Sequence, residues 1–255
     1  MKAKLSNTVS VVFGGNGDIG GAISKGLCKA GALVIPLGRN IPRLKKIIAE
    51  LKKFGNDWDD VLPVDICNEK QVKDIVARII KKTKRIDSMV CASGVYLNKP
   101  AENMTAKDWD SVVGTNLTAN FTVCREVGKV MLEQKKGSII TIGSLGSFVA
   151  LSGTLAYSVS KAGVVSMTQC LASEWTEKGV RVNSIIPGVF PTKLNKKALT
   201  KPGRLDNILK GIPAKRLGNL EELSGAAVFL ASDESSYISG ISMPVDGGFL
   251  GFSGY

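Results

Sequence analysis

Residues 8–20 read TVSVVFGGNGDIG, so a short apolar run passes straight into a glycine-rich turn. A near-continuous apolar run of this length is typical of a strand that is buried on both faces of a parallel sheet. Apolar residues in the following segment, 19–30, have helical spacing. The chain is therefore predicted to begin with a strand, a tight turn and a helix.

The same alternation continues to the end of the chain. Further buried strands are expected at residues 32–37, 61–64, 87–91, 138–142, 181–186 and 241–245. Further helices are expected at residues 41–53, 69–83, 106–134, 155–177 and 220–231. This order predicts an α/β fold, a single doubly wound Rossmann domain over residues 1–255 with helices on both faces of a seven-stranded parallel sheet.

The composition narrows the chemistry that the chain can perform. It contains no histidine, which excludes a Ser-His-Asp triad, a Cys-His pair and a histidine-ligated metal, and no metal site is expected. Its five cysteines are scattered without a C-x-x-C pair, as expected of free thiols in the cytoplasm. No apolar run approaches the roughly 20 residues that span a bilayer, and the basic start leads into a strand rather than an export signal.

A formal net charge of +12 suggests an anionic partner. Nucleic acid is one candidate, but the lysines are spread along helical stretches and no zinc finger, RRM or homeodomain pattern is visible. We therefore expect a solvated, lysine-rich surface and no nucleic-acid partner. A phosphorylated cofactor or an acidic substrate could account for a local part of the charge.

The glycine-rich turn fits a dinucleotide. Gly15-x-Gly17-x-x-Gly20 matches a pattern whose glycines let a pyrophosphate approach the backbone at the N-terminus of a helix. Asp18 is awkward here, because a carboxylate that faced the pyrophosphate would repel it. We expect Asp18 to turn away and leave the phosphates to backbone amides, whereas its ordinary structural role would be to cap the helix.

The end of the second strand distinguishes NAD from NADP. An acidic residue there would bind the ribose 2′-hydroxyl and repel a 2′-phosphate. This chain instead has Gly38, followed by Arg39 and Asn40, and a guanidinium binds phosphate through a fork of donors. NADP(H) is therefore expected in preference to NAD.

Tyr157, Lys161 and Ser144 form a candidate proton-transfer set. Residues i and i+4 share a helix face, and an ammonium near a phenol lowers the pKa of the phenol from about 10. Tyr157 could then exchange a proton with a carbonyl oxygen. Ser144, at the expected end of a strand, could hydrogen-bond the same oxygen.

Together with other motifs, this set resembles the short-chain dehydrogenase/reductase family over essentially the whole chain. The motifs that match are residues 13–20, Asp65, residues 91–94, Asn116, Ser144, Tyr157, Lys161, Pro187, Gly188, Thr192 and residues 245–248. Three departures stand: Phe13 replaces Thr, Asp18 replaces the middle Gly of the turn, and Cys-Ala-Ser at 91–93 replaces Asn-Asn-Ala. They affect the cofactor turn more than the proton-transfer set.

The resemblance implies the reaction and the residues that carry it. A hydride passes between a nicotinamide and a carbonyl carbon, Tyr157 gives or takes the proton of the oxygen, and Ser144 holds that oxygen. Lys161 binds the nicotinamide ribose, and Asn116 holds a water that continues the proton path. Residues implied to bind the cofactor are Gly14, Asn16, Asp18, Ile19, Arg39, Asn40, Asp65, Ile66, Ser93, Gly94, Tyr157, Lys161, Pro187, Gly188, Val189 and Thr192.

The resemblance also implies partners. Family members are commonly tetramers, so a homotetramer or homodimer is expected, joined through the helices at 106–134 and 155–177. Residues 188–217, the expected substrate lid, are rich in cations and resemble the gluconate 5-dehydrogenase and 2-deoxygluconate 3-dehydrogenase branch. The expected substrate is therefore a small carbonyl or alcohol such as a keto-sugar acid.

Three alternatives stay open. The first is a 3-oxoacyl-(acyl carrier protein) reductase, for which Lys135, Lys136 and Lys178 could dock an acidic carrier. The second is a non-catalytic regulator that binds NADP, and the third is a nucleic-acid-binding protein. The intact proton-transfer set argues against the second alternative.

Overall fold

The computed structural model of the chain describes residues 4–193, 195, 199 and 203–251. Within them, six parallel strands form one sheet in the order β2-β1-β3-β4-β5-β6. The strands are β1 (Val9–Phe13), β2 (Leu33–Leu37), β3 (Ser88–Cys91), β4 (Gly137–Ile142), β5 (Val180–Pro187) and β6 (Ser242–Val245). The strand order reverses between β1 and β3, and ligands of such sheets bind beyond the carboxyl ends of the strands at this point.

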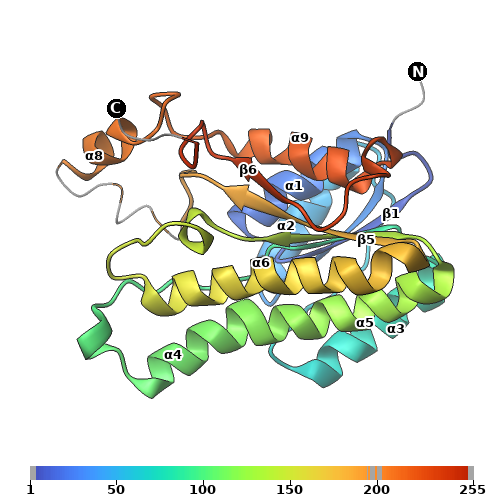
Figure 1. Ribbon diagram of the computed structural model, residues 1–255. Helices are drawn as coiled ribbons and strands as arrows, with labels where there is room; N and C mark the ends of the chain where they lie inside the picture. The colour runs from blue at the N-terminus through green and yellow to red at the C-terminus, as the bar shows by residue number, and fades with distance from the viewer. Residues whose placement is uncertain (1–3, 194, 196–198, 200–202, 252–255) are drawn as a thin grey trace.

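Helices cover both faces of the sheet (Figure 1). One layer consists of α1 (Asp18–Lys29), α2 (Ile41–Lys52) and α9 (Leu220–Ala231). The other consists of α3 (Glu69–Thr83), α4 (Ala106–Val113), α5 (Ala119–Gln134) and α6 (Leu155–Trp175). The short α8 (Arg204–Lys210) lies outside both layers. No helix in the described part of the chain has the length and apolar character needed to cross a membrane.

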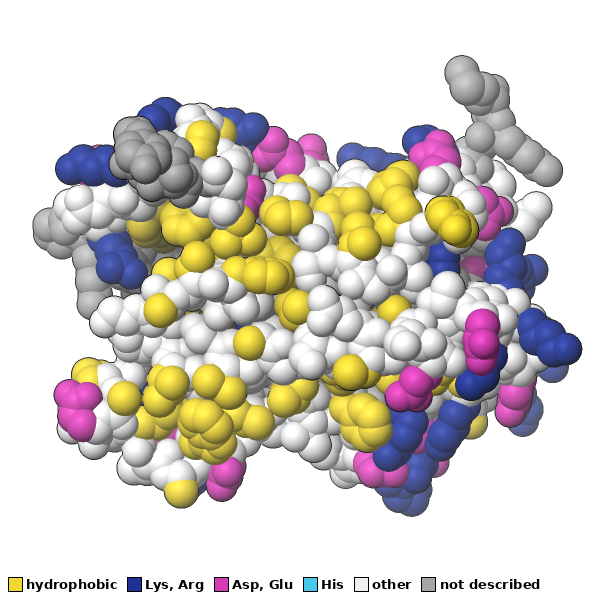
Figure 2. Space-filling model, viewed as in Figure 1, with side chains coloured by type: hydrophobic (Ala, Val, Ile, Leu, Met, Phe, Trp, Pro, Cys, Tyr) yellow, Lys and Arg dark blue, Asp and Glu magenta, His cyan; other side chains and the backbone are white. Residues whose placement is uncertain are grey.

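The core is divided by the sheet because alternate side chains of a strand point to opposite faces. Phe13 and Ile139 belong to the apolar cluster that contains residues of α3 and α5, whereas Val12 and Ile140 belong to the cluster with residues of α1 and α9. Figure 2 shows that hydrophobic side chains also gather on the outer surface over α4, α5 and α6.

The prediction of a seventh strand at 61–64 was wrong. In this segment an isolated bridge pairs Pro63 with Gly38, beside a hydrogen bond of 3.1 Å from Val64 N to Gly38 O. Proline has no N–H to donate to a ladder, which explains why the pairing stops after one bridge. Pro36 is tolerated inside β2 because β2 lies at the edge of the sheet.

The helix expected at 106–134 is interrupted in its first half. α4 ends at Val113, a π-helical turn spans Gly114–Thr118, and α5 begins at Ala119. Such π-turns inside helices occur frequently at functional sites. Here the turn contains the buried side chain of Asn116, one of the predicted site residues.

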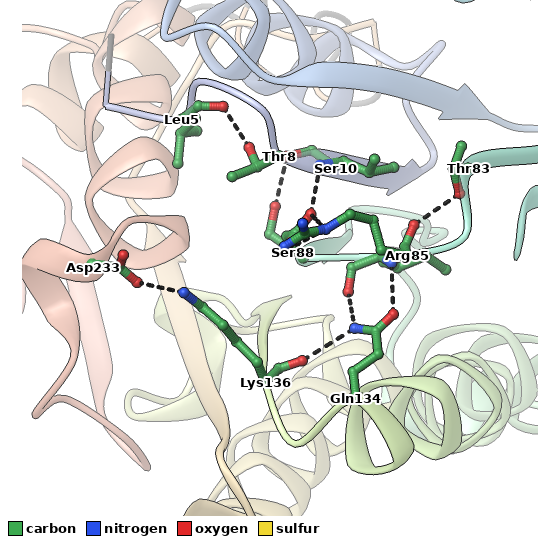
Figure 3. A network of polar contacts seen from close by, with 12 residues as sticks. Leu5, Thr8, Ser10, Thr83, Arg85, Ser88, Gln134, Lys136 and Asp233 are labelled. Atoms are coloured by element: carbon green, nitrogen blue, oxygen red, sulfur yellow. Dashed lines mark hydrogen bonds and ion pairs between the residues drawn. The ribbon is translucent and has the colours of Figure 1, made fainter. Parts of the chain in front are cut away.

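The amino ends of the strands are tied together by polar contacts (Figure 3). Gln134, at the end of α5, accepts from Ile86 N at 3.0 Å and donates to Ile86 O at 2.8 Å, so it pairs the backbone just before β3. Ser10 and Ser88 share a buried hydrogen bond of 2.7 Å between neighbouring strands. These groups are satisfied within the protein, which leaves the opposite, carboxyl edge of the sheet as the place for a ligand.

Candidate active site

The four predicted proton-transfer residues meet at the carboxyl edge of the sheet. Ser144 follows β4, Tyr157 and Lys161 lie one turn apart near the start of α6, and Asn116 lies in the π-turn between α4 and α5. The Nζ of Lys161 lies 6.0 Å from the centre of the Tyr157 ring. The Ser144 side chain lies close enough to the Tyr157 hydroxyl to lower the pKa of the phenol. A carbonyl oxygen placed beside the Tyr157 hydroxyl would therefore also be near Ser144.

Burial, rather than the neighbouring lysine, dominates the proton affinity of Tyr157. Desolvation raises the pKa of the phenol above its ordinary value, while the hydrogen bond with Ser144 lowers it by less. The expectation that Lys161 lowers the pKa of Tyr157 is therefore wrong for this structure. Burial also lowers the pKa of Lys161, to about 8, and its Nζ donates to Ile142 O at 2.8 Å. Tyr157 thus stays protonated at neutral pH, the form that can donate to a carbonyl oxygen.

Asn116 uses its side chain to hold the loop that follows β3. Its Oδ1 accepts from Val95 N at 2.8 Å, and its Nδ2 donates to Val95 O at 2.9 Å and to Ser160 Oγ at 3.1 Å. Ser160 Oγ donates in turn to Tyr157 O at 2.7 Å, which joins this loop to α6. Because both amide protons are committed, a water held by this side chain would bond the second lone pair of Oδ1.

Tyr96 is a site residue that the sequence analysis missed. Its ring packs edge-on against Tyr157, with ring centres 5.1 Å apart and planes at 73°. The loop is fixed before Tyr96 by Asn116 and after it by a hydrogen bond of 2.7 Å from Lys99 N to Gly153 O. These contacts join segments that are distant in the sequence, so no local sequence pattern predicts them. The one sequence feature that could have indicated Tyr96 is its position as an aromatic residue just after the segment 91–94.

The glycine-rich turn has the tight geometry that a dinucleotide site needs. A Cβ at Gly14 would lie 2.8 Å from the backbone of Ala92 and Ser93, and a Cβ at Gly20 would collide with the backbone of Gly14. No side chain of the described residues caps the N-terminus of α1. The first amides of the helix, including that of Ile19, are therefore available to a phosphate, and these uncapped amides fit a dinucleotide.

Asp18 does not cap α1, and its carboxylate bonds the segment after β5. Its Oδ2 accepts from Lys193 N at 2.6 Å, although the two residues are 175 positions apart. Gly17 occupies the N-cap position of α1 instead. Next to Lys193, the predicted cofactor residue Thr192 donates to Asn195 Oδ1 from its N at 2.9 Å and from its Oγ1 at 3.1 Å.

The residues expected to distinguish NADP from NAD lie together after β2. Asn16 Nδ2 donates to Asn40 O at 3.3 Å, and Arg39 Nη1 lies 4.0 Å from Asp65 Oδ2. The Arg39 side chain is 71% exposed, so its guanidinium can turn toward a phosphate. A Cβ at Gly38 would collide with the side-chain amide of Asn16. An acidic side chain at position 38 is therefore opposed sterically as well as absent.

The remaining predicted cofactor residues line the same edge. Gly94 lies against Asn116, since a Cβ there would be 3.1 Å from Asn116 Oδ1. Pro187 ends β5, and Gly188 N donates to Val245 O at 2.9 Å. The carbonyl of the next residue, Val189, accepts from Gly218 N at 3.0 Å. Ser93 lies just after β3, and Ile66 lies just after the Pro63 bridge.

Comparison with known proteins agrees with this geometry. A family model described as enoyl-(acyl carrier protein) reductase matches residues 15–250. The chain belongs to the short-chain dehydrogenase/reductase family. It is accordingly an oxidoreductase that acts on alcohol groups with a nicotinamide cofactor.

Relatives of this short-chain dehydrogenase/reductase have several different activities. The D-threitol dehydrogenase of Mycolicibacterium smegmatis is 36% identical over 96% of this chain and 94% of its own. The 3-oxoacyl-(acyl carrier protein) reductase of Rickettsia felis is 35% identical over 96% and 98% of the two chains. A gluconate 5-dehydrogenase of Burkholderia cenocepacia, crystallised with NADP and tartrate, has a TM-score of 0.94 at 28% identity and 98% coverage of both chains.

The cations of the expected lid differ in their availability. Arg216 is not free, because its two terminal nitrogens bind the carboxylate of Glu222 at 2.7 and 2.8 Å. Lys193 and Lys210 are exposed and make no ion pair with the described acidic residues. Further lid cations, Lys196, Lys197 and Lys201, lie outside the described residues.

Proposed function

We propose that this enzyme uses NADP(H) to interconvert a ketone and a secondary alcohol on a sugar acid or a related polyhydroxy carbonyl compound, as a gluconate 5-dehydrogenase-like enzyme. The observation that carries the proposal is the meeting of Ser144, Tyr157 and Lys161 beside a glycine-rich turn with uncapped helix amides. This arrangement can bind a dinucleotide and protonate a carbonyl oxygen at adjacent positions.

In the reduction, bound NADPH supplies the hydride that reaches the carbonyl carbon. Tyr157 donates its proton to the carbonyl oxygen, because burial keeps the phenol protonated at neutral pH. Ser144 Oγ accepts from Gly146 N at 3.2 Å, and its own proton would turn from the Tyr157 oxygen to the carbonyl oxygen when substrate binds. Lys161 would hold the nicotinamide ribose, and a water near Asn116 would return a proton to Tyr157.

The names of two relatives favour a hydroxylated substrate. D-threitol and gluconate are small molecules with several hydroxyl groups, and gluconate also carries a negative charge. The exposed lysines after β5, Lys193 and Lys210, would attract such an anion. Tyr96 offers an apolar ring and a polar hydroxyl beside Tyr157, a combination that suits a carbon chain with hydroxyl groups.

One substrate panel tests the proposal. Keto-sugar acids such as 5-ketogluconate, neutral ketoses and acetoacetyl thioesters are each offered with NADPH and with NADH, and oxidation of the cofactor is followed by absorbance. We expect turnover of 5-ketogluconate with NADPH well above that of any thioester. Robust thioester turnover without activity on keto-sugars would overturn the assignment in favour of an acyl carrier protein-linked reductase.

The alternative, a 3-oxoacyl-(acyl carrier protein) reductase, shares 35% identity with this chain in the example from Rickettsia felis. The three lysines expected to dock the carrier do not favour it. Lys135 and Lys136 precede β4 and Lys178 precedes β5, so they lie at the amino edge of the sheet. Ser144 follows the six-residue β4, which separates it from these lysines by about 20 Å.

A homotetramer or homodimer is also part of the proposal. Phe121, Leu155 and Val159 are large apolar side chains on α5 and α6 with 42%, 45% and 42% of their surface exposed. Figure 2 shows hydrophobic side chains over the layer of α4, α5 and α6. Exposed apolar side chains on neighbouring helices are typical of an interface between subunits. We propose the cytoplasm as the compartment, in keeping with five free cysteines.

A further inference from the structure

The segment that follows β5 is held in place by contacts with α9 and with the residues just before it. Phe190 is buried in the apolar cluster that contains residues of α1 and α9. Val189 O accepts from Gly218 N at 3.0 Å, which fixes the same end of the segment to the chain just before α9. We call residues 189–193 the post-β5 segment.

Internal hydrogen bonds make the post-β5 segment one unit. Asn195 Oδ1 accepts from both the N and the Oγ1 of Thr192, and Asn195 Nδ2 donates to Phe190 O at 2.8 Å. These bonds set the shape of the segment but not its position relative to the glycine-rich turn. Among the hydrogen bonds of the described residues, the bond from Lys193 N to Asp18 Oδ2 is the one that joins the segment to that turn.

Asp18 can make this bond because α1 does not use it as a cap. Gly17 is the N-cap residue, and Gly17 O accepts from Gly21 N at 2.8 Å. A carboxylate is a strong acceptor for a backbone N–H, and the N-terminus of a helix favours a negative charge. Asp18 is also the first residue of α1, so its charge adjoins the helix amides to which a pyrophosphate would bind, and like charges repel.

We propose that Asp18 is a positioning residue, which holds Thr192 and Lys193 against the glycine-rich turn before the dinucleotide binds and whose charge weakens the binding of the dinucleotide. Through Lys193, Asp18 presets the post-β5 segment, which is the first part of the expected substrate lid. The first half of the proposal depends on the protein alone, and the second half rests on the proposed use of NADP(H).

Four variants separate the hydrogen bond from the charge. Asp18→Asn keeps an oxygen that can accept from Lys193 N but removes the charge. Asp18→Gly and Asp18→Ala remove both, so either one serves if the other fails to fold. Asp74→Asn, at an exposed carboxylate on α3, controls for the loss of one negative charge elsewhere.

Hydrogen exchange of the enzyme without cofactor tests the first half. Peptides that cover residues 188–193 should exchange about tenfold faster in Asp18→Gly and Asp18→Ala, because the hydrogen bond that protects this end is lost. Asp18→Asn and Asp74→Asn should stay within about threefold of the wild type. Equal exchange in the wild type and in the Gly and Ala variants would overturn this half.

Binding of NADPH, measured by titration, tests the second half. Asp18→Asn should lower the Kd about three- to tenfold, because the repulsion between carboxylate and phosphates is removed. Asp18→Gly should raise the KM for the carbonyl substrate more than it lowers kcat, because the post-β5 segment is no longer preset. An unchanged or higher Kd in Asp18→Asn would contradict the charge effect. If neither the wild type nor any variant binds NADPH, the proposed function fails, whereas the exchange result still decides the first half.

Discussion

Tyr157 is the residue whose hydroxyl group the reaction depends on most directly. Tyr157→Phe keeps the ring that packs against Tyr96 but removes the proton donor. We expect kcat to fall by about 10²–10⁴ while the Kd for NADPH stays within about twofold. Steady-state kinetics and NADPH titration check the two quantities separately. A variant that keeps most of its kcat would mean that another group supplies the proton.

Lys161 should make the stability of the protein depend on pH. Its pKa is lowered by burial from 10.5 to about 8, so between these pH values the unfolded chain binds more protons than the folded chain. Stability therefore rises as the pH rises from about 8 to about 10.5, and below pH 8 the full cost of the buried charge is present. Lys161→Met removes this charge. The difference in stability between Lys161→Met and the wild type should therefore shift by about 2–3 kcal/mol in favour of the variant when the pH is lowered from 10 to 7.

Denaturant unfolding at the two pH values measures this difference for Lys161→Met. The hydrogen bond to Ile142 O is lost at both pH values, and any difference between its charged and neutral forms is already contained in the lowered pKa of Lys161. Lys45→Met, at an exposed position on α2, is the matched control and should show no such dependence. If Lys161→Met showed the same pH dependence as the wild type, Lys161 would not titrate with a lowered pKa.

The turn between β2 and α2 should determine the choice of cofactor. Arg39→Leu removes the exposed guanidinium and should weaken NADPH binding about tenfold or more, with little change for NADH. Titration with both cofactors checks this, and Lys45→Leu controls for the loss of a positive charge. Gly38→Asp should also weaken NADPH binding, because its carboxylate would repel a 2′-phosphate, and its Cβ requires the Asn16 amide to shift. Tighter binding of NADH than of NADPH by the wild type would contradict the assignment.

Elements with a strong periodic pattern were predicted well. The helix expected at 69–83 matches α3, and the helix expected at 220–231 matches α9. The errors arose where one residue changed the backbone pairing. Pro63 ended a ladder after a single bridge, and the π-turn around Asn116 interrupted a helix whose apolar spacing continues through it. Neither event changes hydrophobic periodicity, so a reading of periodicity could not detect them.

Contacts within the site also divide into those that a local sequence pattern predicts and those that it does not. Residues that belong to a sequence motif, such as Tyr157 and Lys161, were found because their spacing follows directly from helix geometry. The contact of Tyr96 with Tyr157 and the bond between Asp18 and Lys193 join distant segments. Their geometry depends on how the loops after β3 and β5 are fastened, which only the folded chain specifies.

At the scale of the whole molecule, charge and apolar surface are unevenly distributed. Figure 2 shows Lys and Arg side chains interspersed with Asp and Glu mainly at the right of the view, and hydrophobic side chains in two areas, one over the layer of α4, α5 and α6 and one toward β6 and α9. Several cations are paired with acids, as Lys25 is with Glu50 at 2.6 Å. The net charge of +12 is thus distributed over a solvated surface in this view, and the apolar layer is the better candidate for an interface.

Two phenylalanines allow a matched test of that interface. Phe121 on α5 is 42% exposed and lies under Arg125, with 5.4 Å from the guanidinium carbon to the ring centre. Phe54, after α2, is 43% exposed and lies under Lys29, at 5.0 Å. The two side chains therefore match in exposure and in their cation contact. They differ in that Phe121 belongs to the layer of α4, α5 and α6.

We expect the wild type to run as a dimer or tetramer of its 27.0 kDa chain in size-exclusion chromatography with light scattering. Phe121→Asp should shift the mass toward the monomer, because it removes apolar contact area and forces a carboxylate to lose its water when the interface forms. Phe54→Asp places the same charge on a surface that stays in water, so its mass should match the wild type. A monomeric wild type would refute the interface. A mass lowered only by Phe54→Asp would move the interface to the layer of α1, α2 and α9.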